Sequence, residues 1–331
     1  NLNGTTHTNG GTLSAATLLV GSGATLTNNG TLTSSSALSG AGTLTQGATG
    51  ILNIGGTAGI NAVDASAAGN MVNYTGAGQT VAPALYYHLT LSGSGTPILT
   101  GVSTINGNFS LAGTVATVAA TGMTVGGNCI IGTGTSLTAG TFSHFLKGNW
   151  NNSGTFNAGT STFTLNGTSA QTMSGSTFND LVIDNAAGVS MLTDETISNA
   201  FTLTSGAFSI GAHTLTLNGV LTMGSGSLVG GSSSNIVVGG SGAGTTLPGI
   251  TLNNFSLNRT NGDSLLGDAT IQGTLTITNG TLNSGPNTII LGPGGTLSEI
   301  AGKPLIGNIR TTRSVSGTSG TESFGNIGAE I

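Results

Sequence analysis

The chain repeats one short pattern along most of its length, and residues 201–219 show it clearly: FTLTSGAFSIGAHTLTLNG. Apolar and polar residues alternate over short runs, and a glycine or a small polar residue ends each run. Alternation with a period of two is typical of a β-strand with one buried face, and runs this short have the length of strands rather than helices. No segment shows a clear period of 3.6 residues, so we expect an all-β chain.

The spacing of these runs predicts the architecture, because the apolar residues that we expect to point inward recur about twenty residues further on. The first set is Phe201, Leu203, Phe208, Ile210, Leu215 and Leu217, and the second is Leu221, Met223, Leu228, Ile236 and Val238. Stacked cycles of three short strands are typical of a parallel β-helix, and parallel crossovers favour the right hand. The sequence therefore predicts a right-handed parallel β-helix (β-solenoid) with about 20 residues and three short strands per coil.

A longer repeat suggests how the chain is organised. Gln79 and Phe109 have counterparts 92 residues further on at Gln171 and Phe201, and a third copy follows 74 residues later. The segment 299–331 differs, since it holds three of the five basic residues and three of the ten acids. We expect a solenoid at 1–298 with duplicated modules at about 70–148, 161–233 and 234–298, and a C-terminal cap or transition segment at 299–331.

Composition excludes several functions. Charged residues make up 5% of the chain, against about 25% in a typical globular protein, and the five basic residues are too dispersed to bind nucleic acid. No run of about 18 apolar residues predicts a helical membrane span. The chain has 59 glycines, but 36% of its residues are hydrophobic and periodically placed, which favours order over disorder.

Residues 148–191, GNWNNSGTFNAGTSTFTLNGTSAQTMSGSTFNDLVIDNAAGVSM, and the later phrases FTLTSGAF and HTLTLNG carry a resemblance. They resemble the β-helical repeat regions of large secreted surface proteins and adhesins of Bacteroidota and related bacteria. The similarity covers most of residues 11–298 and contains no catalytic motif. It implies a secreted protein at the cell surface, with a structural or adhesive role.

Some β-helices are polysaccharide-active enzymes, and these need clustered carboxylates. Here the acids are mostly isolated. Asp180 and Asp184 would share one face of a strand about 13 Å apart, and Asp194 and Glu195 would point to opposite faces. We therefore expect no catalytic residues and a non-catalytic protein.

The histidines and the single cysteine predict neither a metal site nor a cofactor. His88 and His213 occupy outward positions where other copies of the repeat carry small polar residues. Cys129 aligns with Leu221, an inward position, so we expect a buried core thiol rather than a nucleophile.

Two aromatic residues are candidates for binding surface glycans. Aromatic residues are only 4% of the chain, and exposed rings can stack on sugars. Tyr86 aligns with Phe178 and Leu252 and is expected in the core, which leaves Tyr87 and Trp150 as the candidate ligand-binding residues.

Thr-x-Thr pairs, as at Thr25–Thr27 and Thr202–Thr204, suggest an alternative function, because a flat ladder of such pairs can order water and bind ice. The ladder requires pairs on successive coils. One coil after Thr202 and Thr204 the chain reads LTMG at 221–224, so the pairs are not expected to continue.

The leading hypothesis is a non-catalytic structural protein of the bacterial cell surface, either a rigid stalk or a fibre subunit with a possible adhesive role. An open solenoid end exposes unpaired strand edges. We therefore expect either continuation in a longer chain or end-to-end self-association.

Overall fold

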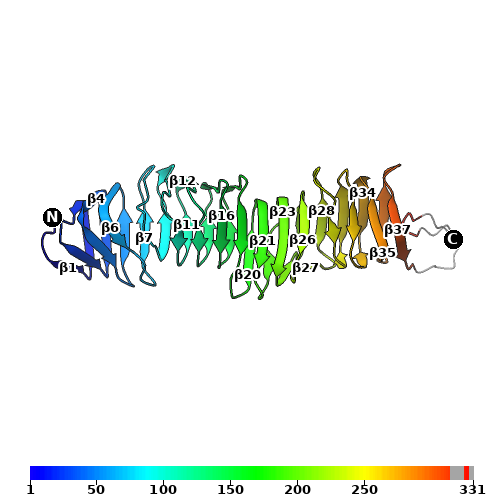
Figure 1. The fold of residues 1–331 in the computed structure, drawn as a ribbon, viewed down its shortest axis with the longest axis horizontal. Helices are drawn as coiled ribbons and strands as arrows, with labels where there is room; N and C mark the ends of the chain where they lie inside the picture. The colour runs from blue at the N-terminus through cyan, green and yellow to red at the C-terminus, as the bar shows by residue number, and fades with distance from the viewer. Residues whose placement is uncertain (314–323, 328–331) are drawn as a thin grey trace. The chain divides into compact units, whose positions relative to one another are not determined.

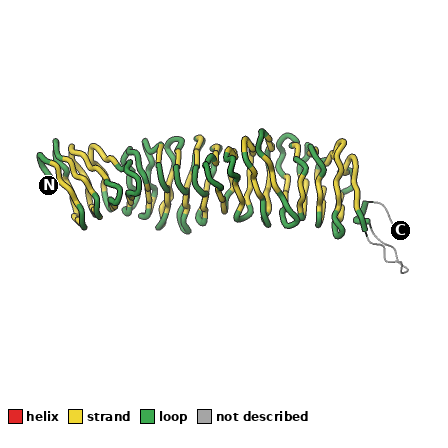
Figure 2. Tube along the Cα trace, turned by 90° about the horizontal axis from the view of Figure 1, so that it is seen from below, coloured by secondary structure: helices red, strands yellow, loops and turns green. Residues whose placement is uncertain are grey.

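The computed structural model describes residues 1–313 and 324–327, and every regular element in these ranges is a β-strand. The strand pairings within each part of the chain are parallel. Together the coils number about 15, with roughly 20 residues in each. The predicted parallel β-solenoid is therefore confirmed, while its right-handed crossover stays a prediction. Figure 2 shows short strands alternating with loops along the whole described trace.

The chain divides into two compact units, Asn1–Gly167 and Thr168–Ile331. Each unit is a stack of coils built from parallel strands (Figure 1). The predicted duplicated modules stay a prediction. Parallel pairing continues beyond residue 298, since strand β37 (Leu305–Thr311) pairs with β35 (Leu282–Leu291). Part of the segment 299–331 thus continues the solenoid, and the rest of that segment lies outside the described residues apart from 312–313 and 324–327.

The strands of the first unit form three sets of hydrogen-bonded neighbours. The largest runs through β1 (Thr6–Asn9), β3 (Thr25–Asn28), β4 (Thr31–Gln46), β5 (Ile51–Ile54), β7 (Met71–Tyr74), β8 (His88–Leu91), β11 (Phe109–Leu111), β14 (Cys129–Ile131) and β17 (Trp150–Asn152), with β2 (Thr12–Leu19) and β6 (Thr57–Asp64) paired to β4. The second comprises β10 (Thr104–Ile105), β13 (Thr124–Val125), β16 (Ser143–Leu146) and β19 (Thr162–Leu165). The third comprises β9 (Ser94–Gly95), β12 (Thr114–Val118), β15 (Ser136–Thr138) and β18 (Thr155–Asn157).

The strands of the second unit also form three such sets. One comprises β20 (Gln171–Ser174), β22 (Val189–Met191), β24 (Ala207–Ser209) and β27 (Ser227–Val229). The next runs through β21 (Thr177–Asp184), β23 (Glu195–Ser205), β25 (Thr214–Leu217), β28 (Asn235–Val238), β31 (Asn254–Asn258), β34 (Thr274–Asn279) and β36 (Thr296–Glu299), with β26 (Val220–Met223) paired to β23. The last joins β29 (Thr246–Leu247), β32 (Asp263–Leu265), β35, β33 (Ala269–Ile271) and β30 (Ile250–Leu252), with β37 on β35.

The core consists of inward columns of apolar side chains, in the register that the sequence predicts. Phe201 lies opposite Leu221 and Phe208 opposite Leu228, one coil apart. All four side chains are buried, and only Met223 of the predicted inward set is half-buried. Each buried side chain of this size contributes roughly 1.5–3 kcal/mol, so the stacked columns are the main source of stability.

Three amide side chains near one corner are paired along the stack. The Asn9 side-chain amide donates to Asn28 Oδ1 at 2.7 Å, and the Asn28 amide donates to Gln46 Oε1 at 2.9 Å. These residues sit at equivalent positions of three successive coils. The ladder satisfies amide groups that would otherwise be costly to bury at this corner, except Gln46 Nε2, which has no partner within the described residues.

Glycine at the corners has a steric cause that is clear at Gly206. Its φ is +77°, a conformation that favours glycine, and a Cβ atom there would collide with the backbone carbonyl of Asn185. The corner lies between β23 and β24 and lets the chain turn from one sheet to the next.

Candidate functional site

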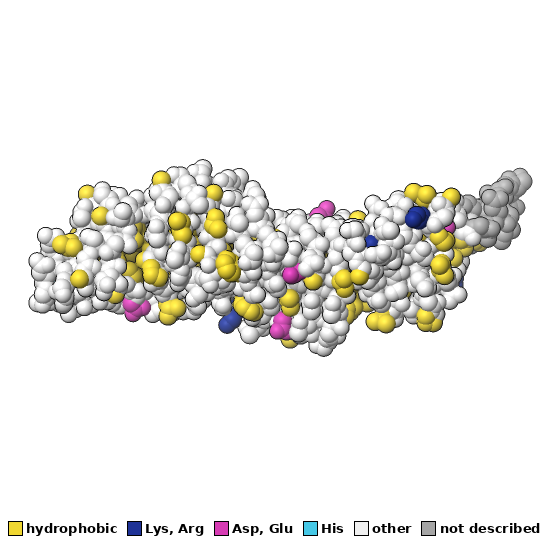
Figure 3. All heavy atoms as spheres, turned by 45° about the horizontal axis from the view of Figure 1, so that its top comes forward, with side chains coloured by type: hydrophobic (Ala, Val, Ile, Leu, Met, Phe, Trp, Pro, Cys, Tyr) yellow, Lys and Arg dark blue, Asp and Glu magenta, His cyan; other side chains and the backbone are white. Residues whose placement is uncertain are grey.

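The surface is dominated by small uncharged polar groups, and charged side chains are isolated on the face drawn in Figure 3. The side chains capable of chemistry are therefore spread along the chain rather than gathered in one place. Most of those in the described chain prove to be engaged in holding coils together.

The expectation that Trp150 presents an exposed ring is wrong. Its side chain is 0% exposed, and it lies one coil after Cys129 in an inward column. The ring makes edge-to-face contacts with Phe156 at 4.7 Å and Phe163 at 5.0 Å between ring centroids. Such aromatic pairs favour the core, so this ring cannot stack on a sugar at the surface.

Tyr87 keeps a surface position. It is half-buried, and its ring packs edge-to-face on His88 at 4.6 Å. The neighbouring Tyr86 is fully buried, as predicted, with its hydroxyl 2.6 Å from the Ala82 carbonyl oxygen. Tyr87 and Trp150 belong to coils three apart in the register, so the structure does not bring them together.

Asp180 and Asp184 join adjacent coils. Asp180 Oδ1 accepts hydrogen bonds from the Asn199 side-chain amide at 2.6 Å and from the Ala200 backbone amide at 2.9 Å. Asp184 Oδ1 accepts from the Ser205 hydroxyl at 2.8 Å. Each donor lies one coil further along the chain, so both carboxylates link β21 to β23 by hydrogen bonds.

The same role recurs at two other acids. Asp194 Oδ1 accepts from the Thr214 backbone amide at 2.8 Å, and Asp268 Oδ1 accepts from the Thr288 backbone amide at 2.7 Å. His213 lies beside Asp194 at 3.9 Å, with both side chains partly exposed. A surface pair of this kind contributes little to stability.

Glu195 is the acid with the most unusual surroundings. As predicted, it faces away from Asp194, and its side chain enters the interior, where the residue is 1% exposed. Its carboxylate accepts from the Ser176 backbone amide at 3.0 Å and from the Thr193 hydroxyl at 3.1 Å. Burial raises the pKa of the Glu195 carboxyl to about 7, although these hydrogen bonds oppose the shift.

This raised pKa predicts a pH-dependent stability. The folded chain binds the Glu195 proton more tightly than the unfolded chain, whose ordinary value is 4.5. The contribution of Glu195 to the free energy of unfolding should therefore be fully present below about pH 4.5. It should decline by roughly 3 kcal/mol as the pH rises to about 7. Glu195→Gln, which keeps the shape without the charge, should remove this decline in denaturant titrations across pH. Asp194→Asn is the matched control and should keep it, and an unchanged profile in Glu195→Gln would contradict the assignment.

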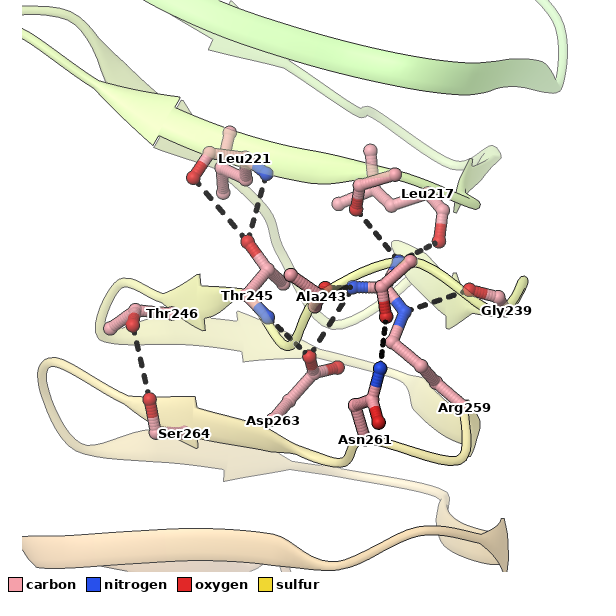
Figure 4. Close-up of polar contacts among 12 residues, drawn as sticks. Leu217, Leu221, Gly239, Ala243, Thr245, Thr246, Arg259, Asn261, Asp263 and Ser264 are labelled. Carbon is pink, nitrogen blue, oxygen red and sulfur yellow. Dashed lines mark hydrogen bonds and ion pairs between the residues drawn. The ribbon is translucent and has the colours of Figure 1, made fainter.

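The most elaborate polar cluster lies at the corner between β31 and β32, around Arg259 and Asp263 (Figure 4). Both side chains are 0% exposed, and Arg259 Nη1 lies 3.4 Å from Asp263 Oδ1. The guanidinium also donates to four backbone carbonyl oxygens. They belong to Leu217 at 2.9 Å, Gly219 at 2.7 Å, Gly239 at 2.8 Å and Ala243 at 3.0 Å.

These carbonyls come from the corners that follow β25 and β28, the two strands that precede β31 in the stack. Arg259 therefore ties three successive coils together from within. Asp263 Oδ1 also accepts from the Thr245 backbone amide at 2.7 Å. Burial raises the Asp263 pKa, while the Thr245 amide and the Arg259 charge oppose that shift. The sequence offered one weak signal for this cluster, an Arg and an Asp four residues apart in RTNGD at 259–263.

Cys129 and His144 are core residues. Cys129 is buried, as predicted, and burial raises the pKa of its thiol to about 12. His144 is also buried and stacks on Phe163 at 4.6 Å, with Nε2 3.0 Å from the Ala139 carbonyl oxygen. Burial lowers the His144 pKa, so a neutral ring is favoured.

Two findings concern possible cofactors and membranes. Within the part of the chain that the structure describes, no three His, Cys, Asp or Glu side chains lie close enough together to hold a metal ion. In the same residues, no helix has the length and apolar character needed to cross a membrane.

A shallow hollow of about 440 Å³ lies beside Gly55 and Gln79 in the first unit, and none of the residues that line it is titratable.

Comparison of the chain with family models, with curated proteins and with solved structures found no match.

Proposed function

We propose that this chain is a non-catalytic structural protein of the bacterial cell surface, serving as a β-solenoid stalk or fibre subunit. One observation carries the proposal: side chains that serve chemistry in β-helical enzymes are here bonded to the backbone of adjacent coils. Asp180, Asp194 and Asp268 accept backbone amides one coil away, and Arg259 binds carbonyls of two preceding coils. This use of charge favours a mechanical role.

The proposed location can be tested on cells that express the chain naturally. Antibodies raised against the purified chain should label intact cells, and added protease should remove the label. A control antibody against a cytoplasmic protein should label only permeabilised cells. Labelling of the chain that also requires permeabilisation would contradict the surface location.

The choice between stalk and fibre subunit depends on self-association. Negative-stain electron microscopy over a concentration series separates the two, since filaments of uniform width assign the fibre role and separate particles assign the stalk. Side-by-side amorphous aggregates at every concentration would support neither role.

The adhesive part of the proposal rests on Tyr87, a half-buried aromatic ring on a surface with few others. A glycan array should show binding by the purified chain that Tyr87→Ala removes and Tyr87→Phe retains, because the ring face supplies the stacking surface. Equal binding by all three proteins, or no binding by any, would exclude Tyr87 as a glycan contact.

A further inference from the structure

The first three coils carry a regular array of threonine side chains. Strands β1, β3 and the end of β4 each contribute one Thr-x-Thr pair, and they stack in register without a shift. One column contains Thr6, Thr25 and Thr43, and the other contains Thr8, Thr27 and Thr45. We call these six residues the threonine grid.

The expectation that Thr-x-Thr pairs fail to stack therefore does not hold for these coils. It was argued from Thr202 and Thr204 in the second unit. There Thr202 does lie opposite Thr222, but Leu203 lies opposite Met223 and the next residue is Gly224, so no second column forms. The threonine grid has both columns on three consecutive coils.

The grid faces outward, and its hydroxyls are available. Of the residues between the columns, Leu26 and Leu44 are buried and His7 on the first coil is half-buried. Thr6 and Thr8 are exposed, and the other four threonines are half-buried, as expected within a flat sheet. None of the six hydroxyls makes a hydrogen bond to another described residue. In the column of Asn254, by contrast, the side chain is engaged, since Asn254 Oδ1 accepts from the Thr274 backbone amide.

The grid is also rigid, evenly spaced and uncharged. Threonines two apart on a strand are about 6.7 Å apart, and equivalent threonines on adjacent coils are about 4.8 Å apart. Branching at Cβ restricts χ1, so the hydroxyl and methyl positions are held by the backbone. The whole first unit contains only two charged side chains of Asp, Glu, Lys or Arg, namely Asp64 and Lys147. Asp64 lies opposite Thr45 and Ala62 opposite Thr43, which ends the grid on the next coil.

A matching ligand has to be flat, neutral and periodic in two directions. Each threonine hydroxyl can donate one hydrogen bond and accept two. It can therefore hydrogen-bond to water molecules at the surface of an ice lattice. A rigid array loses little conformational freedom on binding, so many weak contacts can add up. A crystalline polysaccharide is also periodic, but the grid contains no aromatic ring for sugar stacking.

We propose that the threonine grid binds the surface of ice crystals. This inference is independent of the proposed structural role, because it rests on different residues. Water ordered on the grid would join the ice lattice, and the methyl groups would exclude disordered water between the columns.

The test is ice-recrystallisation inhibition and thermal hysteresis of the purified full chain. The unmodified chain should inhibit crystal growth, and Thr27→Tyr, which places a bulky ring within the grid, should require roughly tenfold more protein or more for the same effect. The matched control is Thr270→Tyr, the same change in an outward, half-buried column of the second unit. Circular dichroism should show both variants folded.

Three outcomes would overturn the proposal. The first is no effect of the unmodified chain on ice. The second is equal loss of activity in Thr27→Tyr and Thr270→Tyr. The third is binding to crystalline cellulose or chitin that Thr27→Tyr removes while ice growth is unaffected by either protein, which would assign the grid to a polysaccharide surface.

Discussion

Arg259→Met will lower the stability of the second unit by about 3–5 kcal/mol, the range found when one partner of a buried ion pair is removed. The substitution leaves the Asp263 carboxylate buried without its cation. It also removes the guanidinium donor from four carbonyl oxygens, of which, within the described residues, only Leu217 O keeps another donor, the Gly239 backbone amide. Chemical denaturation followed by circular dichroism should show the corresponding shift. Because coils interact mainly with their neighbours, the transition of the second unit should move without an equal change in the first.

Two further variants make this prediction specific. Arg310→Met makes the same chemical change at an exposed position of β37 and should alter stability by less than about 0.5 kcal/mol. The double variant Arg259→Met with Asp263→Leu removes both charges and should still be destabilised, because three carbonyl oxygens still lack the guanidinium donor. If Arg259→Met is as mild as Arg310→Met, or if the double variant regains full stability, Arg259 does not tie the coils as described.

Trp150→Ala will cost about 3–5 kcal/mol, as expected for truncating a fully buried aromatic side chain. The cavity would lie beside Phe156 and Phe163, each of which loses one edge-to-face contact and keeps the contact with the other. Thermal unfolding of the variant should show a clearly lower midpoint. Trp150 is the single tryptophan, so the native chain should also emit at short wavelength and resist quenching by acrylamide.

Tyr87→Ala is the comparison for this variant. Tyr87 is half-buried with one aromatic neighbour, so its truncation should cost well under half as much. Ready quenching of Trp150 fluorescence in the folded chain, or equal destabilisation by the two truncations, would contradict the burial of Trp150.

The coil and its core could be predicted because both depend on a local, repeated signal. A β-solenoid places the residue one period later directly above its predecessor, so the twenty-residue spacing from Phe201 to Leu221 specifies their contact. The same logic placed Cys129 and Tyr86 in the core. Few folds allow contacts to be inferred from sequence spacing so directly.

The repeat register also predicts a core position for Trp150. The tryptophan follows Cys129 by 21 residues, and the two lie opposite each other in an inward column. Its rarity in an aromatic-poor chain suggested a ligand contact, but a large ring fills a core position well. The register was the stronger signal.

Arg259 could not be placed from sequence. Its partners are carbonyl oxygens on two earlier coils, and any residue type provides a carbonyl. A charged residue within RTNGD is typical of an exposed turn. Only the convergence of three corners in space makes burial of the guanidinium favourable. The threonine grid was not predicted, because the coil after Thr202 and Thr204 in the second unit does not represent the first three coils.

Pulling single molecules of the chain by its two ends tests the structural role most directly. We expect the chain to stay folded as tension rises and then to lengthen in discrete steps of one coil or a few coils. A coil of about 20 residues would release up to roughly 70 Å of chain. Smooth lengthening from the lowest tension, without steps, would contradict the account, because coils that separate so easily cannot serve as a stalk or fibre.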